Sequence, residues 1–112
     1  METLFTERKN CLVVVPPERL DTITSPEAAE TITEKIQSGE HKIIFDFSRT
    51  DYVSSAGLRV ILVALKLLKK TNGKMALCNA NDQILEVLEI SGFHSLVKYL
   101  GSLDEAVAFV SG

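Results

Sequence analysis

Two adjacent serines, Ser54 and Ser55, have the residue type and the position to support chemistry. They stand between an expected strand and the longest helical pattern, so their hydroxyls should lie where the N–H groups of a helix start are unpaired. The simplest interpretation is helix capping, which stabilises a helix by about 1 kcal/mol and needs no further function. A serine nucleophile is the chemical alternative, but it requires a general base. His41 and His94 fall in other loops, and nothing in the sequence orients either of them toward Ser55.

Gly57 follows the two serines within the first expected helical turn. A helix selected for stability alone would carry alanine at this position and would gain up to about 1 kcal/mol. We therefore expect Gly57 to leave open backbone beside the Ser55 hydroxyl, in a space that a partner could enter.

The remaining sequence predicts the elements that hold this segment in place. Pro16 and Pro17 end a starting hairpin, and a loop follows to Thr24. Ser25 is expected to cap the first helix, and Gly39 is expected to end it. The expected strands cover residues 4–7, 11–15, 42–47, 74–78 and 96–100, and the later helices cover residues 55–71, 82–91 and 103–110.

After the hairpin, helices and strands alternate along the chain. This order indicates βαβ crossovers and a mainly parallel sheet with helices packed against it. The apolar start of residues 42–47 is typical of a strand covered on both faces. With 112 residues, the sequence predicts one α/β domain over residues 1–112, with about five strands and about four helices.

Composition excludes several classes of function. The net charge of −3 and the pI of about 5.3 provide no positive field for a nucleic acid partner. No apolar run reaches the roughly 20 residues of a membrane span, and no export signal is recognisable, so we expect a cytoplasmic protein without a membrane partner. Cys11 and Cys78 are expected to be reduced, packed thiols. No metal-ligand spacing or nucleotide-binding glycine motif is present, so no cofactor is expected.

The longest expected helix has an apolar side and a basic side. The apolar side carries Leu58, Ile61, Leu62, Leu65 and Leu68. Val60, Val63 and Leu67 fall on or beside the side that carries Arg59 and Lys66. Contact with a partner and partial burial in the core explain these apolar residues equally well, and the two charges are typical of a solvated surface.

Residues 53–62, Val53-Ser54-Ser55-Ala56-Gly57-Leu58-Arg59-Val60-Ile61-Leu62, resemble the signature of STAS domains, specifically of bacterial anti-sigma factor antagonists. Leu20-Asp21 and residues 72–75 and 88–93 fit further segments of that family, so the resemblance covers nearly the whole chain. Two positions depart from the family pattern. Ser54 stands where the best-known members carry aspartate, and Glu18 replaces the glycine that precedes Leu-Asp.

The resemblance implies a switch operated by phosphate. In that family an anti-sigma factor that is also a kinase phosphorylates a serine at the start of the second helix, and a phosphatase reverses the reaction. The implied acceptor is Ser55, with Ser54 as the alternative. The implied partner-binding residues are Asp21, Ser54, Gly57, Leu58, Arg59 and Val63.

The resemblance further implies a non-enzymatic module that sequesters its partner when it is unphosphorylated. A constitutive STAS adaptor or scaffold without a phosphate switch is the alternative function. The sequence shows no long exposed heptad pattern, so we expect a monomer in isolation. A phosphate at a helix N-terminus is locally favourable by about 0.3–1 kcal/mol, so the switch should act at an interface and should not unfold the domain.

Overall fold

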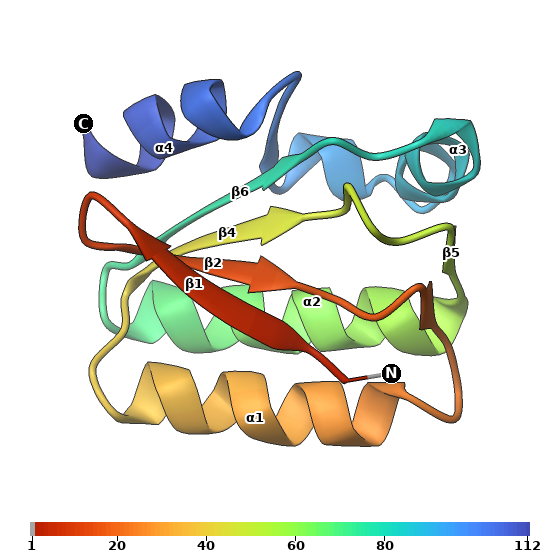
Figure 1. Ribbon diagram of the computed structural model, residues 1–112, viewed down its shortest axis with the longest axis horizontal. Helices are drawn as coiled ribbons and strands as arrows, with labels where there is room; N and C mark the ends of the chain where they lie inside the picture. The colour runs from red at the N-terminus through yellow and green to blue at the C-terminus, as the bar shows by residue number, and fades with distance from the viewer. Residues whose placement is uncertain (1) are drawn as a thin grey trace.

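The computed structural model describes residues 2–112 and shows a five-stranded sheet with helices on both faces (Figure 1). The strand order is β1-β2-β4-β6-β7, and every neighbouring pair is parallel except β1 and β2. The strands are β1 (Leu4–Arg8), β2 (Cys11–Val15), β3 (Arg19–Leu20), β4 (Lys42–Asp46), β5 (Tyr52–Val53), β6 (Lys74–Cys78) and β7 (Lys98–Leu100). The helices are α1 (Ser25–Gln37), α2 (Ser55–Lys70), α3 (Asp82–Ile90) and α4 (Leu103–Ser111), with a 3₁₀ turn at Phe93–Ser95. The α/β class predicted from the sequence is confirmed.

A tight turn joins the two strands of the starting hairpin. Lys9 and Asn10 have φ angles of +50° and +66°, the backbone pattern of a two-residue type I′ turn. Arg8, which the sequence placed in the connection, instead pairs with Cys11 at the end of the ladder. The antiparallel β1 therefore forms one edge of an otherwise parallel sheet.

The two faces of the sheet bury different apolar sets. Ile43, Phe45 and Leu77 point toward α1 and α2 and belong to the larger core. Cys11, Ile44, Ala76 and Cys78 point the other way and pack against α4 (Figure 1). Burial of a large apolar side chain contributes about 1.5–3 kcal/mol, so the sheet is stabilised from both sides, as the apolar pattern of residues 42–47 indicates. Both cysteines are buried and unpaired, which confirms the packed thiols. No helix within residues 2–112 combines the length and the apolar character needed to cross a membrane.

Helix starts follow the sequence in three cases out of four. Ser54, Asn81 and Ser102 cap α2, α3 and α4, each accepting a backbone N–H three residues later. The prediction that Ser25 caps α1 is wrong. The N-cap is Thr24, Ser25 is the first helical residue, and the Ser25 hydroxyl is buried without a hydrogen-bond partner among residues 2–112.

Two short strands were not predicted from the sequence. β3 and β5 pair in parallel and form a separate two-stranded sheet, with Arg19 beside Tyr52 and Leu20 beside Val53. The region from Glu18 to Thr24 is therefore not entirely a loop. Conversely, the expected strand at residues 96–100 is shorter, because the 3₁₀ turn precedes it and pairing begins at Lys98. The small β3–β5 sheet leads directly into α2 and positions the candidate site.

Candidate functional site

The start of α2 is held against β3 by the backbone. The N–H of Ser54 donates to the Leu20 carbonyl oxygen at 3.0 Å, directly after the β5 residue that pairs with Leu20. Residues 20 and 54 are thus joined across 34 positions of sequence. This connection fixes where α2 begins relative to the loop that contains Asp21.

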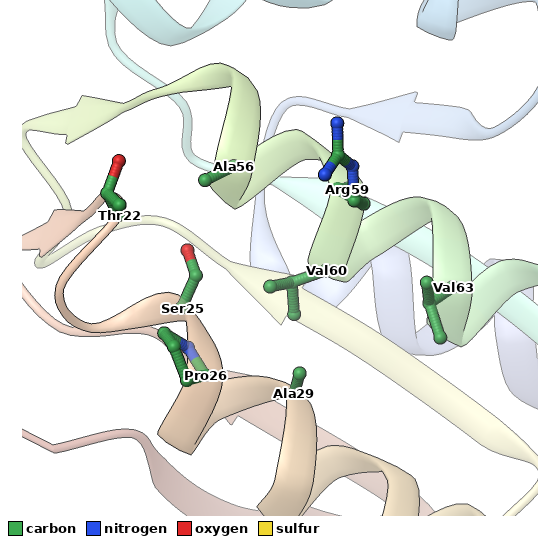
Figure 2. A pocket seen from close by; sticks show the side chains of 8 residues that line it. All are labelled: Thr22, Ser25, Pro26, Ala29, Ala56, Arg59, Val60 and Val63. Atoms are coloured by element: carbon green, nitrogen blue, oxygen red, sulfur yellow. The ribbon is translucent and has the colours of Figure 1, made fainter.

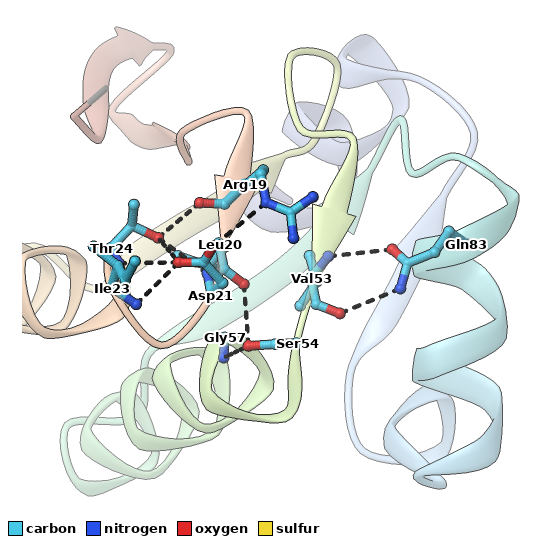
Figure 3. A network of polar contacts seen from close by, with 9 residues as sticks. All are labelled: Arg19, Leu20, Asp21, Ile23, Thr24, Val53, Ser54, Gly57 and Gln83. Carbon is cyan, nitrogen blue, oxygen red and sulfur yellow. Dashed lines mark hydrogen bonds and ion pairs between the residues drawn. The ribbon is translucent and has the colours of Figure 1, made fainter.

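The side chain of Ser54 is used within the structure. Its Oγ accepts the Gly57 N–H at 3.2 Å and lies 3.4 Å from the Leu20 carbonyl oxygen, to which it donates (Figure 3). Ser54 has the extended backbone expected of an N-cap residue, with φ −91° and ψ 177°. Its half-buried hydroxyl therefore serves the capping function that the simplest interpretation of the sequence gives it.

Ser55 has a different environment from its neighbour. It is the first residue of α2, it is exposed, and its hydroxyl makes no hydrogen bond within the part of the chain that the structure describes. Ser55 borders an open pocket of about 270 Å³ between α2 and α3, together with Leu58, Val87 and Ile90. The two serines thus differ, because the Ser54 hydroxyl caps α2 and the Ser55 hydroxyl is exposed without a hydrogen bond to any residue in the range 2–112.

The sequence analysis predicted that Gly57 leaves open backbone for a partner, and this prediction is wrong. The residue is buried, and a Cβ at this position would lie 2.5 Å from the Leu20 carbonyl oxygen and 3.0 Å from a Val53 methyl carbon. Glycine is needed because the first turn of α2 packs directly onto β3 and β5. The contact is tertiary, so the local sequence contains no signal for it.

Asp21 organises the chain before α1. Its Oδ1 accepts the N–H groups of Ile23 and Thr24 at 3.0 and 3.2 Å, and Arg19 Nε lies 3.4 Å from its Oδ2 (Figure 3). The hydrogen bond from the Thr24 N–H, with further bonds from Ile23 and Arg19, lowers the pKa of Asp21 below its ordinary value. The Arg19 guanidinium also lies 4.4 Å from the centre of the Tyr52 ring. The carboxylate is thus tied to the loop beside the site.

A side chain that the sequence did not single out anchors the other side of β5. The Oε1 of Gln83 accepts the Val53 N–H at 3.2 Å, and its Nε2 donates to the Val53 carbonyl oxygen at 3.3 Å (Figure 3). Because a side-chain amide has one acceptor and one donor group, it can satisfy both backbone groups of one residue. Gln83 therefore couples α3 to the strand that precedes Ser55.

An apolar groove separates the first halves of α1 and α2. It has a volume of about 260 Å³, and Figure 2 shows Ala29 and Val60 pointing toward each other across it. Val60 is 5% exposed and belongs to the core, whereas Val63 is 40% exposed. The sequence did not decide whether Val60 and Val63 are buried or contact a partner. The structure shows that Val60 is buried. Arg59 is exposed and borders the groove, with its guanidinium directed away from α1.

The predicted site residues lie around the first half of α2 but border different hollows. Ser55 and Leu58 line the pocket between α2 and α3, whereas Arg59 and Val63 line the α1–α2 groove. Asp21 lies in the loop between β3 and α1.

The sequence analysis missed two exposed isoleucines. Ile90 lines the pocket beside Ser55 and is 78% exposed, and Ile23 lies beside Asp21 and is 86% exposed. Nothing in their local sequence distinguishes them from core isoleucines, because exposure depends on the packing of α1 and α3.

The chemistry available at this surface is that of a modifiable hydroxyl. The turn before β4, which contains His41, and the start of α2, which contains Ser55, lie at opposite ends of the sheet (Figure 1). His94 borders a different pocket, with Leu88 and Tyr99. Within residues 2–112 no group of three or more histidine, cysteine or acidic side chains is placed to hold a metal ion.

A surface built around one free serine at a helix start can be compared with known families. The family model described as the STAS domain matches residues 3–106. The chain belongs to the STAS domain family.

This STAS domain is similar in sequence to proteins named as anti-sigma factor antagonists. The BtrV protein of Bordetella bronchiseptica is 39% identical over 77 residues, which are 69% of this chain and 66% of that protein. The chain thus spans just under two thirds of the length of that relative. A homologue from Thermotoga neapolitana is 30% identical over 79 residues, which are 70% of each protein.

Solved structures show the same fold. The anti-sigma factor antagonist structure TM1081 from Thermotoga maritima has a TM-score of 0.93 at 21% identity, covering 98% of this STAS domain and 95% of that chain. The Bacillus cell fate determinant SpoIIAA, solved in its phosphorylated form, has a TM-score of 0.75 at 20% identity, covering 96% of this chain and 98% of that chain. At these identities the likeness concerns the arrangement of helices and strands.

Proposed function

We propose that this STAS domain is an anti-sigma factor antagonist that is controlled by phosphorylation of Ser55. Without phosphate, the domain binds and sequesters an anti-sigma factor that is also a serine kinase. With phosphate on Ser55, the complex dissociates, and a protein serine phosphatase restores binding. The antagonist names of the relatives and the phosphorylated form of one structural neighbour support this proposal.

The observation that carries the proposal is the difference between the two serine hydroxyls. Ser55 is exposed and makes no hydrogen bond within residues 2–112, so phosphorylation there breaks nothing. Phosphorylation of Ser54 would remove the hydroxyl that donates to the Leu20 carbonyl oxygen and would crowd the acceptor of the Gly57 N–H. The structure therefore favours Ser55 over Ser54 as the acceptor.

The transfer needs a partner that supplies both ATP and the base. The Ser55 Oγ attacks the γ-phosphorus, the new O–P bond forms, and the bond from that phosphorus to the β–γ bridging oxygen breaks. ADP leaves, and the hydroxyl proton passes to a base on the kinase. Such a reaction requires the kinase to enclose Ser55, so the surrounding surface must be part of the interface.

The surface around Ser55 has the character of a protein contact. We call Leu58, Val87 and Ile90, which line the pocket beside Ser55, the apolar collar. Leu58 follows Ser55 by about one turn of α2, and Val87 and Ile90 lie near the end of α3. Ile90 is 78% exposed, and covering a large apolar side chain contributes about 1.5–3 kcal/mol. The collar thus supplies affinity around the residue that the kinase must reach.

Phosphorylation changes the charge within this contact. A phosphoserine carries about −1.5 to −2 charges, which the N-terminus of α2 tolerates in the free domain. In the complex, the same group would be enclosed by the apolar collar and would lose its hydration. A loss of 10²–10⁴-fold in affinity corresponds to only about 3–6 kcal/mol, which one buried, unmatched phosphate can supply.

A phosphorylation assay with matched serine variants tests the proposal. The wild-type chain, Ser55→Ala and Ser54→Ala are incubated with ATP and an extract of the cells that naturally produce the chain. Each is then recovered for intact mass measurement and phosphopeptide mapping. We expect one phosphate on the wild type and on Ser54→Ala, and none on Ser55→Ala. Phosphate on Ser54 alone, or a retained kinase without any phosphate transfer, would contradict the switch and favour the constitutive adaptor.

A further inference from the structure

Arg59 lies one helical turn after Ser55 on the exposed side of α2. It makes no ion pair within the part of the chain that the structure describes, although Arg8 and Arg19 both do. Residues four apart in a helix are neighbours on its surface, and helical side chains lean toward the N-terminus. The Arg59 side chain is therefore positioned to reach the turn that begins at Ser55. In Figure 2 the guanidinium points away from α1 and not across the α1–α2 groove.

We propose that Arg59 is the receptor for the phosphate on Ser55, so that the guanidinium binds phosphoryl oxygens of the modified residue within the same helix. This inference rests on the proposed function, in which Ser55 is the modified residue. It assigns to Arg59 a role in the phosphorylated state that is separate from any contact with the kinase.

The chemistry of the pair is favourable. A guanidinium offers a planar fork of N–H donors that matches two phosphate oxygens, and the resulting hydrogen bonds are charge-assisted. An acidic group placed four residues before a basic one on a helix is also the better of the two orientations. α2 contains no acidic residue, so no carboxylate on this helix competes for Arg59.

Other charges near the start of α2 do not replace Arg59. Arg19 is bound to Asp21 and lies over the Tyr52 ring. Lys66 is on the same stripe of α2 but eleven residues from Ser55, about 16 Å along the helix axis. The acidic residues on adjacent elements include Asp21 before α1, which is bound to Arg19. They also include the exposed Glu30 on α1, Asp51 before β5, and Glu86 and Glu89 on α3. These carboxylates would repel a phosphate, which leaves Arg59 as its cation.

The pairing has a consequence for the surface beside Ser55. In the unmodified domain, Arg59 borders the α1–α2 groove as an uncompensated positive charge next to Val63. When a phosphate on Ser55 binds the guanidinium, this charge is neutralised. Phosphorylation of Ser55 therefore changes the electrostatic potential both at Ser55 and at the edge of the α1–α2 groove beside Arg59.

The second ionisation of the phosphate measures the pairing directly. Phosphoserine is incorporated at position 55 during synthesis of the full chain, and phosphorus NMR follows its titration near pH 6. A guanidinium partner stabilises the dianion, so the phosphate pKa should be lower in the otherwise wild-type chain than in Arg59→Gln, by about 0.3 to 0.7. Arg59→Lys should restore part of the difference, and about 1 M salt should reduce it. Lys66→Gln is the matched control and should leave the phosphate pKa unchanged.

Two results would overturn the role of Arg59. One is a phosphate pKa that is the same in the otherwise wild-type chain and in Arg59→Gln. The other is a change in the phosphate pKa on Lys66→Gln that is as large as the change on Arg59→Gln, which would indicate a general electrostatic effect of the positive charges. Because the phosphate is installed during synthesis, neither result depends on whether a kinase modifies Ser55. A natural chain that acquires no phosphate would instead contradict the proposed function and would leave the measured Arg59 pairing intact.

Discussion

The carbonyl oxygen of Leu20 lies 2.5 Å from the point that a Cβ on Gly57 would occupy. This separation is shorter than any ordinary contact, and the Leu20 oxygen is a backbone atom that cannot rotate away as a side chain could. The first turn of α2 can therefore approach β3 only because residue 57 has no side chain. The same carbonyl oxygen accepts the Ser54 N–H, so relaxation away from position 57 would stretch that hydrogen bond.

Substitution of Gly57 by alanine should destabilise the domain. The gain in helix propensity is at most about 1 kcal/mol, whereas overpacking against fixed backbone costs about 1–3 kcal/mol. We expect a lower denaturation midpoint in urea with an unchanged slope. Ser55→Ala, two residues earlier and exposed, is the control and should not lower the midpoint. Equal or greater stability of Gly57→Ala would show that the close approach to Leu20 is absent in solution.

The two serines should differ in their effect on stability. Ser54→Ala removes the cap of α2 and leaves the Gly57 N–H without its acceptor, so we expect a loss of about 1 kcal/mol. Ser55→Ala removes a hydroxyl that has no hydrogen-bond partner within residues 2–112 and introduces a better helix former. Parallel urea titrations of the two variants measure the difference. Similar losses for both would mean that the capping role is shared.

Gln83 should be a structural requirement of the site. Gln83→Leu keeps a similar volume but leaves the buried Val53 N–H and carbonyl unpaired, which costs about 1–3 kcal/mol per group. Hydrogen exchange of the Val53 amide should accelerate in this variant. Gln83→Glu is the matched control, because it retains an acceptor for the N–H and loses only the donor. If the Val53 amide exchanges at the same rate in all three proteins, Gln83 does not hold β5.

The low pKa of Asp21 predicts an acid-dependent contribution to stability. A carboxyl group whose pKa is lower in the folded state stabilises the fold above its unfolded pKa of about 3.9, and the contribution disappears as pH falls through the folded value. Asp21→Asn keeps an oxygen acceptor for the Ile23 and Thr24 N–H groups but has no charge. Its stability deficit relative to wild type should be present at neutral pH and should shrink as pH falls below the unfolded pKa of about 3.9. A deficit that is the same at pH 7 and pH 2.5 would exclude the charge as its cause.

The buried thiols should be chemically silent in the folded protein. Burial, with a smaller effect of Asp46, raises the pKa of Cys78 to about 12, and burial also raises the pKa of Cys11. The reactive thiolate is therefore scarce at neutral pH. A thiol reagent at pH 8 should label neither cysteine until denaturant is added. Rapid labelling of Cys78 in native buffer would show that α4 opens frequently.

Sequence patterns predicted the elements that have a long apolar period. α2 was recoverable because its buried residues recur at helical spacing over four turns, and Gly92 was a reliable stop for α3 because its φ of +75° suits glycine. β3 and β5 were missed because two residues are too short to show a period of two. The predicted cap of α1 was wrong because the side chains of Asp21 and Thr24 each accept the other residue's backbone N–H, which forms a turn before Ser25 and places Ser25 inside α1.

The helical pattern of α2 also made part of the candidate site predictable. The Ser54–Ser55 pair could be identified because it precedes a strong helical pattern, but the sequence could not decide which hydroxyl caps the helix. That choice depends on the Leu20 carbonyl oxygen, which is 34 residues away. The exposure of Ile23 and Ile90 depends on how α1 and α3 pack. The burial of Gly57 likewise arises only when β3 and β5 pair.

The side-chain amide of Gln83 also determines whether the edge of the small β3–β5 sheet can pair with another chain. Tyr52 and Ser54 donate their N–H groups toward the β3 side, so Val53 between them presents its N–H and carbonyl on the outer edge. An uncovered edge of this kind is a template for an extended segment of another chain. Gln83 occupies both groups and closes the ladder after two strands. The surface beside Ser55 can thus remain apolar and accessible without inviting aggregation by strand addition.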